Sequence, residues 1–311
     1  KGLRPITRLS VPVVVVGNVV AGGAGKTPMV IALVQHCVQS GWKVGVVSRG
    51  FGRTTDEVRP VRAQSMAQEV GDEPLLIART TQVPVWVGRD RVAAAQALLA
   101  EHPELNLIIS DDGLQHLSLA RDLELCVFDE RGLGNGWLLP AGPLREPWPR
   151  THAFAPLCLD VEAIDAAATH ALDTDQRILV RRALADYAYR ADGSRRALWH
   201  WQGQSVRALA GIAKPEKFFQ ALQAQGLHLR QCIALPDHHD MQDVTLSLTY
   251  SEQGLAEDVL CTEKDAVKLW ARYPHVWAVP LVANLPRSLT DHIDALVLAS
   301  VRQPSTTRVQ R

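Results

Sequence analysis

The chain has 311 residues, of which 47% are hydrophobic and 21% are charged. This length suits two domains of roughly 150 residues each, with enough apolar side chains to bury a core in both. Lys and Arg together number 33, as do Asp and Glu. This balance gives no support to a nucleic-acid partner, which usually requires a basic face.

The sequence lacks the signals of a secreted or membrane-spanning protein. Its five cysteines are scattered and form no C-x-x-C pair, so neither a disulfide framework nor a zinc site is indicated. No apolar stretch reaches the ~18 residues that cross a bilayer. The first residues, KGLRPITRLS, contain no signal-peptide core, and we expect a cytosolic protein.

Short apolar runs alternate with helical stretches in the first half, which predicts a doubly wound, mainly parallel α/β sheet domain. The expected strands are 11–16, 43–48, 83–87, 105–110 and 123–128, and the expected helices are 28–40, 73–79 and 91–101. Nearly continuous Val, Ile and Leu in the strands favour burial on both faces. Functional loops should then lie at the carboxyl ends of the strands.

The segment from about 130 to 150 is rich in Gly and Pro and predicts a long functional loop. Polar and apolar residues then alternate over 177–202 around Asp192 and Gly193, which predicts a β-hairpin linker. The rest of the chain alternates strands with helices again. We expect a first α/β domain at 1–165, followed at 166–311 by the linker and a smaller α/β domain that closes over the cleft of the first.

The segment GNVVAGGAGKTP at 17–28 is the clearest functional signal, because it follows the apolar run VPVVVV. Gly22, Gly23 and Gly25 allow positive φ and can expose N–H groups to phosphate oxygens at a helix N-terminus. Strand, glycine-rich loop and helix in this order predict a P-loop nucleotide site.

The two residues after these glycines strengthen that prediction. Lys26 would place a positive charge on the β/γ-phosphates, and the Thr27 hydroxyl would reach Mg²⁺. The usual pattern, G-x-x-x-x-G-K-[ST], requires a first glycine where Val20 stands. A plain glycine-rich turn is the alternative, although it would not require Lys and Thr at these positions.

The segment SDDGLQH at 110–116 follows an expected buried strand, so Asp111 and Asp112 should emerge at its carboxyl end. Adjacent carboxylates repel each other unless a cation or hydrogen-bond donors stabilise both, which indicates Mg²⁺. An aspartate pair that caps a turn is the alternative.

Three further segments are ambiguous when taken alone. Asp72 in GDEP is best interpreted as a helix N-cap. Arg49 and Arg53 in SRGFGR could bind an anion or remain solvated. Arg145 and Glu146 in PLREP lie in the expected long loop.

The second half offers two more segments with charged residues. PDHHD at 236–240 lacks a zinc-binding spacing and could serve as a base, orient a charge or form a turn. In CTEKDAVKL at 261–269, a strand runs into a helix whose first turn holds Glu263, Lys264 and Asp265, and a capped helix is the favoured interpretation.

Eight segments in this order resemble the tetraacyldisaccharide 4'-kinase family of lipid A biosynthesis: GNVVAGGAGKTP, SRGFGR, GDEP, DDGLQH, GNGWLLPAGPLREP, GIAKPEKFF, PDHH and CTEKDAVK. The family's loop has the form GN-x-x-x-GG-x-GKTP and also lacks the usual first glycine. The resemblance implies an ATP- and Mg²⁺-dependent kinase. Its acceptor would be the 4'-hydroxyl of a tetraacylated glucosamine disaccharide 1-phosphate, and its product lipid IVA.

The resemblance also implies roles for individual residues. Asp72 would be the catalytic base, and His238 its partner from the second domain. The implied nucleotide-binding residues are Gly22, Gly23, Ala24, Gly25, Lys26 and Thr27; the Mg²⁺ and phosphate residues are Thr27, Asp111, Asp112 and Glu146; and the residues that line the cleft are Arg49, Phe51, His116 and Arg145.

The expected location is the cytoplasmic face of the bacterial inner membrane, where the protein would act as a peripheral monomer without a nucleic-acid partner. The chain starts about ten residues before the P-loop strand, so we expect the family's N-terminal membrane-associating stretch to be absent. Phe51 also stands where many members have tyrosine, which would remove any hydroxyl role at that position.

Two other function classes fit the glycine loop. A P-loop ATPase or GTPase switch would hydrolyse the nucleotide with water, but no clear guanine-binding signature is present, and TEKD at 262–265 is only an imperfect match. A kinase for a soluble acceptor fits equally well. The acceptor that takes the γ-phosphoryl group discriminates among these possibilities.

Overall fold

The computed structural model describes residues 5–23, 25–149, 155–159, 178–237, 239, 241, 244 and 258–302. The chain divides into two compact units. The larger unit comprises Lys1–Arg181 and Ala283–Arg311, and the smaller unit comprises Arg182–Val282. The sequence predicted one boundary at 165/166, whereas the chain returns to the larger unit after residue 282.

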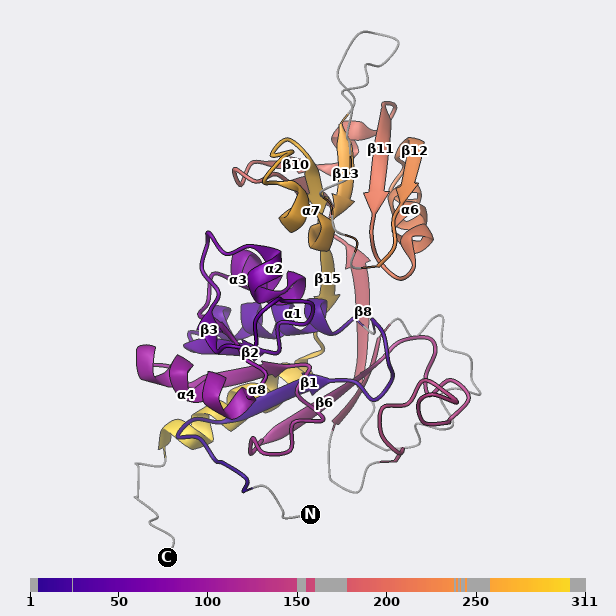
Figure 1. The fold of residues 1–311 in the computed structure, drawn as a ribbon. Coiled ribbons are helices and arrows are strands. Elements are labelled where there is room, and N and C mark those ends of the chain that lie inside the picture. The colour runs from indigo at the N-terminus through magenta and orange to yellow at the C-terminus, as the bar shows by residue number, and fades with distance from the viewer. Residues whose placement is uncertain are drawn as a thin grey trace, which may run out of the picture. The chain divides into compact units, whose positions relative to one another are not determined.

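The larger unit is built on a mostly parallel sheet (Figure 1). Its strand order is β15-β8-β7-β6-β1-β5-β2-β4-β3. The strands are β1 (Val13–Gly17), β2 (Val44–Ser48), β3 (Arg59–Pro60), β4 (Val85–Val87), β5 (Leu107–Asp111), β6 (Leu123–Phe128), β7 (Ala155–Leu159), β8 (Ile178–Leu184) and β15 (Leu281–Asn284). The strands from β8 to β4 pair in parallel, and β3 is antiparallel to β4. The central strands are Val-rich and buried, as parallel strands require.

Helices cover both faces of this sheet. They are α1 (Lys26–Gln39), α2 (Ala67–Val70), α3 (Asp72–Thr81), α4 (Arg91–Glu101) and α8 (Arg287–Arg302). Buried residues of α4 pack with Val13 and Val15 of β1 in one cluster. The buried face of α1, including Met29 and Leu33, takes no part in that cluster and contacts β1, β2 and β5. Because alternate strand residues face opposite sides, α1 lies on the opposite face from α4.

Helix α8 belongs to the larger unit because its side chains bond to α1 and the loop after it. Asp294 accepts a hydrogen bond from Trp42 Nε1 at 2.7 Å, and its Oδ1 lies 3.2 Å from His36 Nε2. Leu289, Ile293 and Val297 form the buried stripe of α8. The C-terminal part of the chain therefore completes the larger unit.

The topology collects several loops at one edge of the larger sheet. β1 lies between β5 and β6, and β5 lies next to β2. Because these strands are parallel, the segments that follow their carboxyl ends are neighbours. These segments are the glycine loop, defined as residues 17–27, and those that begin at Arg49, Asp112 and Asp129.

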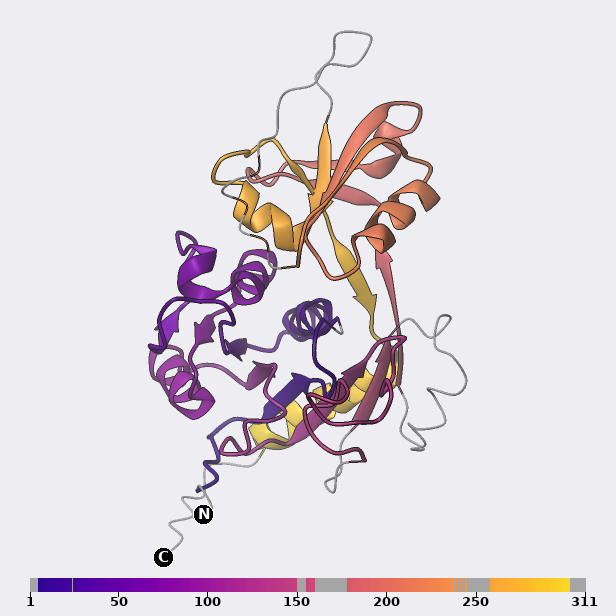
Figure 2. The ribbon, with the colours of Figure 1, turned by 45° about the vertical axis from the view of Figure 1, so that its right-hand side comes forward.

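The smaller unit has its own sheet, in the order β10-β9-β14-β13-β11-β12. Its elements are β9 (Tyr187–Tyr189), β10 (Arg195–Ala197), β11 (Ser205–Ala210), α6 (Pro215–Ala224), β12 (His228–Ala234), β13 (Val259–Thr262), α7 (Glu263–Leu269) and β14 (Trp277–Val279). Ala208 packs in one cluster with α6, and Leu209 packs in another with α7. These helices lie on opposite faces of the sheet (Figure 2).

The hairpin expected as a linker between the domains is part of the smaller sheet. β9 and β10 pair antiparallel around the turn that contains Asp192 and Gly193, but both strands belong to the smaller sheet. The preceding strand, β8, belongs to the larger sheet instead. The alternating pattern over 177–202 therefore covers strands of two different sheets.

Candidate functional site

The glycine loop leads from buried β1 directly into α1. Gly22 has φ 96° and Gly25 has φ 82°, values that favour glycine, and Gly25 is the N-cap of α1. Lys26 and Thr27 are the first residues of the helix and are partly buried. Ala24 lies outside the described residues. A strand, a loop with left-handed glycines and a helix N-terminus form the arrangement expected of an anion site.

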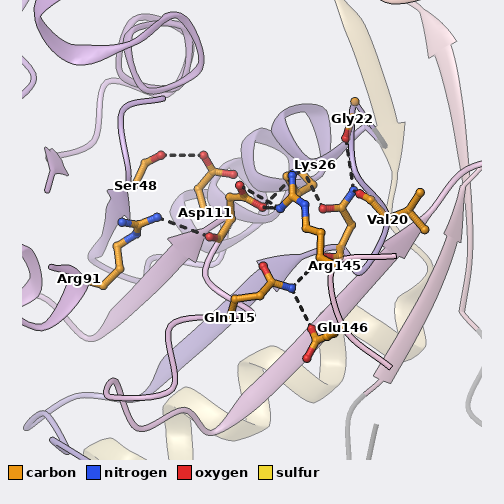
Figure 3. A network of polar contacts seen from close by, with 12 residues as sticks. Val20, Gly22, Lys26, Ser48, Arg91, Asp111, Gln115, Arg145 and Glu146 are labelled. Carbon is orange, nitrogen blue, oxygen red and sulfur yellow. Dashed lines mark hydrogen bonds and ion pairs between the residues drawn. The ribbon is translucent and has the colours of Figure 1, made fainter. Parts of the chain in front are cut away.

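Asn18 organises the first part of this loop and is fully buried. Its Nδ2 donates to the carbonyl oxygens of Val20 and Gly22, and its Oδ1 accepts a hydrogen bond of 3.2 Å from Lys26 Nζ. One amide thus holds both the loop backbone and the lysine. Figure 3 shows these contacts.

The second aspartate of SDDGLQH joins the same network. Asp112 has φ 49° and follows β5. Its Oδ1 lies 3.5 Å from Lys26 Nζ and accepts a hydrogen bond of 3.0 Å from Arg145 Nη1. Burial alone would raise the pKa of Asp112, but the charges of Lys26 and Arg145 outweigh this effect and lower the pKa. Asp112 is therefore a stable carboxylate beside the glycine loop.

Asp111 is in a different environment, because it is buried at the end of β5. Ser48 Oγ, at the end of β2, donates to Asp111 Oδ2 at 2.9 Å. Burial, followed by repulsion from Asp112, raises the pKa of Asp111 to about 6. The adjacent carboxylates therefore titrate in different pH ranges.

This pKa predicts how stability changes with pH in the absence of nucleotide and metal. A raised carboxyl pKa stabilises the folded state below about pH 4, and this contribution of roughly 3 kcal/mol is lost as pH rises through about 6. We expect Asp111→Asn to unfold at higher denaturant concentration than the wild type at pH 7.5. The difference should largely disappear near pH 3.5, below the pKa of the unfolded carboxyl group. An equal difference at both pH values in chemical denaturation would contradict the pKa.

The Gly/Pro-rich loop is folded back onto the glycine loop. Arg145 N donates to Val19 O at 2.7 Å, and Ala21 N donates to Pro143 O at 2.8 Å. A bridge between Val20 and Leu144 lies between these bonds. The backbone thus places Arg145 beside the glycine loop, although more than one hundred residues separate the two segments.

Glu146 is linked to the same site through Gln115. Gln115 Nε2 donates to Glu146 Oε1 at 2.8 Å and to Asn18 O at 3.1 Å. Gln115 belongs to the segment SDDGLQH, but its residue type indicated no role. Its amide ties residues 112–116 after β5, the aspartate loop, to both the glycine loop and the Gly/Pro-rich loop (Figure 3).

Two glycines bring the segment after β2 close to the start of α3. Gly50 and Gly71 have φ 69° and 93°, and a Cβ on Gly71 would lie 2.9 Å from Gly50 Cα. Arg49 and Phe51 are exposed on either side of Gly50. Neither glycine can be replaced by a larger residue without a backbone shift, because the two loops are in direct backbone contact.

The expected N-cap role of Asp72 is wrong. Gly71 is the N-cap of α3, and Asp72 is its first helical residue, partly buried. The adjacent Glu73 is close enough to Asp111 for its charge to raise the pKa of that carboxyl. The start of α3 therefore lies near the aspartate pair, and its carboxylates also benefit from the helix dipole.

His116 has partners at the N-terminus of α4. Its Nε2 accepts a hydrogen bond of 3.2 Å from Arg91 N and lies 2.9 Å from Ser118 Oγ. Arg91 is 3% exposed, and its Nη2 donates to Asp112 O at 3.4 Å. Its Nη1 donates to Gly88 O at 2.7 Å, just before α4. The sequence did not single out Arg91, because the contact that links it to the site, to Asp112 O, joins two different loops.

The segment TEKDAVKL in the smaller unit forms the capped helix that the sequence favoured. Thr262 Oγ1 accepts a hydrogen bond from Asp265 N at the start of α7. Lys264 Nζ donates to Asp237 Oδ1, and Lys268 Nζ donates to His239 O, both at 2.9 Å. His238 lies outside the described residues. α7 thus binds Asp237 and His239, the two residues that flank His238 in the sequence.

Carboxylates and a hydroxyl in the larger unit are suited to Mg²⁺. Within the part of the chain that the structure describes, no group of three His, Cys, Asp or Glu could hold a metal ion by itself. Mg²⁺ is typically bound through one or two carboxylates together with substrate phosphates. Asp111 and Asp112 beside the glycine loop fit this pattern.

In the same described part of the chain, no helix is both long and apolar enough to cross a membrane. The α/β fold, the glycine loop and its charged neighbours are those of a nucleotide-binding protein.

Comparison with known proteins identifies the family. The family model described as tetraacyldisaccharide-1-P 4'-kinase matches residues 1–298, and the chain belongs to this family. The tetraacyldisaccharide 4'-kinase of Acidovorax sp. (strain JS42) is 49% identical over 94% of this chain and 83% of its own length. That of Delftia acidovorans is 47% identical over 97% and 86%.

A solved structure supports the fold as well. A crystal structure of LpxK from Aquifex aeolicus in complex with ATP is 28% identical, with a TM-score of 0.79, and the match covers 94% of this chain and 90% of that one. These findings confirm the resemblance seen in the sequence, and the chain is a kinase of lipid A biosynthesis.

Proposed function

We propose that this kinase transfers the γ-phosphoryl group of ATP to the 4'-hydroxyl of a tetraacylated glucosamine disaccharide 1-phosphate and so forms lipid IVA. The observation that carries this proposal is the convergence of Lys26, Asp112 and Arg145 beside the glycine loop in a member of the tetraacyldisaccharide-1-P 4'-kinase family. The loop N–H groups and the start of α1 would bind the phosphates.

Lys26 would release its internal partners when ATP binds. Asn18 Oδ1 and Asp112 Oδ1 hold its ammonium at 3.2 and 3.5 Å, so the charge is already directed into the site without nucleotide. The β- and γ-phosphates would then replace or share these contacts. A preorganised charge stabilises the transferring phosphoryl group without the cost of reorganisation.

We assign Mg²⁺ to the oxygen ligands around the loop. Thr27, Asp111, Asp112 and Glu146 are the proposed metal and phosphate residues. The metal would neutralise charge on the β- and γ-phosphates. Asp112 remains ionised because Lys26 and Arg145 lower its pKa, which keeps a hard anionic ligand available.

This assignment predicts the effect of Asp112→Asn. We expect the Mg²⁺ concentration for half-maximal activity to rise ~10-fold while the KM for the lipid changes less than about twofold, because the substitution removes a charge that balances the cation. Asp122→Asn is a matched control, since Asp122 lies before β6 and pairs with Arg8 instead. An unchanged Mg²⁺ titration would refute the assignment.

The acceptor side of the site remains a proposal from the family resemblance. Arg49 and Phe51 would contact the acceptor, together with His116 and Arg145. Arg49 and Phe51 are exposed, whereas Arg145 is bonded to Asp112. We propose that Arg145 serves the phosphate side of the reaction as well as the acceptor, because its guanidinium is shared with the aspartate loop.

Asp72 is proposed as the general base, with His238 of the smaller unit as its partner. The smaller unit would close over the site during catalysis. The protein would work as a peripheral monomer at the cytoplasmic face of the inner membrane.

The acceptor experiment distinguishes this function from its alternatives. ATP labelled with ³²P in the γ-position is incubated with the protein and Mg²⁺ in three separate reactions. One contains the lipid disaccharide 1-phosphate in detergent, one contains glucosamine 1-phosphate, and one contains no acceptor. Label should enter the lipid. Label only in the soluble sugar would favour a soluble acceptor, and release of phosphate at the same rate without any acceptor would favour an ATPase switch.

A further inference from the structure

An arginine–aspartate pair follows β6 at the same edge of the sheet as the glycine loop. Asp129 is 7% exposed. It accepts hydrogen bonds from Arg131 Nε at 2.9 Å and from the Arg131 backbone N at 3.0 Å, and its Oδ2 lies 2.7 Å from Arg131 Nη2. The hydrogen bond to Asp129 raises the pKa of Arg131 above its usual value. The guanidinium is therefore charged and fixed in direction.

The same guanidinium also binds the glycine loop. Arg131 Nη2 donates to Gly23 O at 3.1 Å, and Nη1 donates to Ala21 O at 3.4 Å. A Cβ on Gly22 would lie 3.3 Å from Nη1. Arg131 thus binds the backbone carbonyl groups on both sides of Gly22, where it also leaves little room for a side chain.

Asn18 binds the carbonyl groups that Arg131 does not reach. Its Nδ2 donates to the oxygens of Val20 and Gly22. Four consecutive carbonyl groups, those of residues 20–23, are therefore bound alternately by Asn18 and by Arg131. A loop without such donors could turn one of these oxygens toward a bound phosphate, which would repel it.

The direction of the carbonyls also fixes the N–H groups. In a trans peptide, the C=O of one residue and the N–H of the next point in opposite directions. When Arg131 holds Ala21 O, the N–H of Gly22 points away from the guanidinium. When Asn18 holds Gly22 O, the N–H of Gly23 points away from the amide. Both donors are then oriented before any anion binds.

We propose that Arg131, anchored by Asp129, is a positioning residue that preorganises the glycine loop for the phosphates of ATP. This inference rests on the proposed function of the loop. Arg131 acts on the nucleotide through the backbone of Ala21 and Gly23, so its loss weakens binding of ATP and leaves binding of the lipid acceptor unchanged.

The test compares Arg131→Ala with Arg8→Ala. Asp122 and Asp129 flank β6, and each pairs with an arginine, but Arg8 binds Asp122 at the other end of the strand. For Arg131→Ala, we expect the KM for ATP to rise ~10-fold and the KM for the lipid to change less than about twofold, because only the loop donors lose their orientation. Arg8→Ala should change neither KM.

A thermal measurement makes the test independent of catalysis. ATP with Mg²⁺ should raise the melting temperature of the wild type and of Arg8→Ala, and this rise should be at least halved in Arg131→Ala at the same ATP concentration. If the wild type transfers no phosphate to the lipid but shows the ATP-dependent rise, the proposed function fails while the role of Arg131 is still tested.

Conservative variants complete the test. Arg131→Lys keeps the charge but cannot bridge two carbonyl oxygens and a carboxylate, so its KM for ATP should lie between those of the wild type and Arg131→Ala. Asp129→Asn should resemble Arg131→Lys. An unchanged KM for ATP in Arg131→Ala, a fall in kcat alone, or an equal rise in both KM values would overturn the proposal. If Arg131→Ala does not fold, Arg131→Lys and Asp129→Asn decide it by the same readouts.

Discussion

Lys26→Ala is expected to lower kcat by ~10³-fold or more while the protein remains folded, because it removes the charge that the glycine loop directs to the β- and γ-phosphates. The structure adds a reason for this size. Lys26 Nζ is held between Asn18 Oδ1 and Asp112 Oδ1, so its position is fixed before ATP binds. The phosphorylation rate of the lipid at saturating ATP measures this effect.

Lys26→Gln separates the charge of the lysine from its structural role. The glutamine amide can still donate to Asn18, so the loop should stay ordered, but the charge is lost. We expect kcat to fall almost as far as in Lys26→Ala. Lys43→Ala is the matched control, because Lys43 lies just before β2 at the opposite end of the sheet. Lipid phosphorylation near the wild-type rate in folded Lys26→Ala would refute the phosphate-binding assignment of the loop.

Local pattern predicted the central elements of the larger unit well. β6 and α4 begin and end at the residues expected from the sequence. For α4 the physical reason is visible, since Asp90 Oδ1 accepts from the backbone N of Val92 and of Ala93 at the helix start. β1 and β2 shift by only one or two residues, because their apolar runs are bounded by polar or glycine residues.

The sequence failed where a boundary depends on distant contacts. The division at 165/166 missed the return of the chain through β15 and α8 to the larger unit, because Asp294 bonds to Trp42 across more than 250 positions. Asp72 was predicted to cap α3, yet Gly71 occupies that position. The close approach of Gly71 to Gly50 requires this backbone, and no local propensity encodes such a contact.

The candidate site shows the same division between local and distant information. Lys26 and Asp112 could be singled out because they follow buried strands, whereas Arg145 was ambiguous alone and gained a role only from the family resemblance. The residues that hold them in place could not. Arg131 bonds to Gly23, 108 positions away, and Gln115 bonds to Asn18, 97 positions away. Only the order of strands in the sheet brings these loops together.

Asp72→Asn is the second substitution with a large expected effect, and it tests the proposed base. Because Asp72 is the first residue of α3 and not its cap, the loss of charge at the helix start should cost only about 0.5 kcal/mol of stability. Loss of a general base should instead lower kcat by ~10²–10⁴-fold. Asp90→Asn is the matched control, since Asp90 caps α4 and asparagine also caps. A small effect of Asp72→Asn on kcat would refute the base assignment.

A double mutant tests the role proposed for His238. If the imidazole orients or electrostatically supports Asp72, removal of either residue already disables the unit. Asp72→Asn/His238→Ala should then be scarcely slower than the slower single variant. Fully multiplicative losses would mean that the two residues act independently.

His239→Ala is the control, because the backbone carbonyl of His239 that Lys268 binds is retained in that variant. A greater loss in His239→Ala than in His238→Ala would transfer the catalytic assignment to His239, since both histidines lie in the same PDHHD segment.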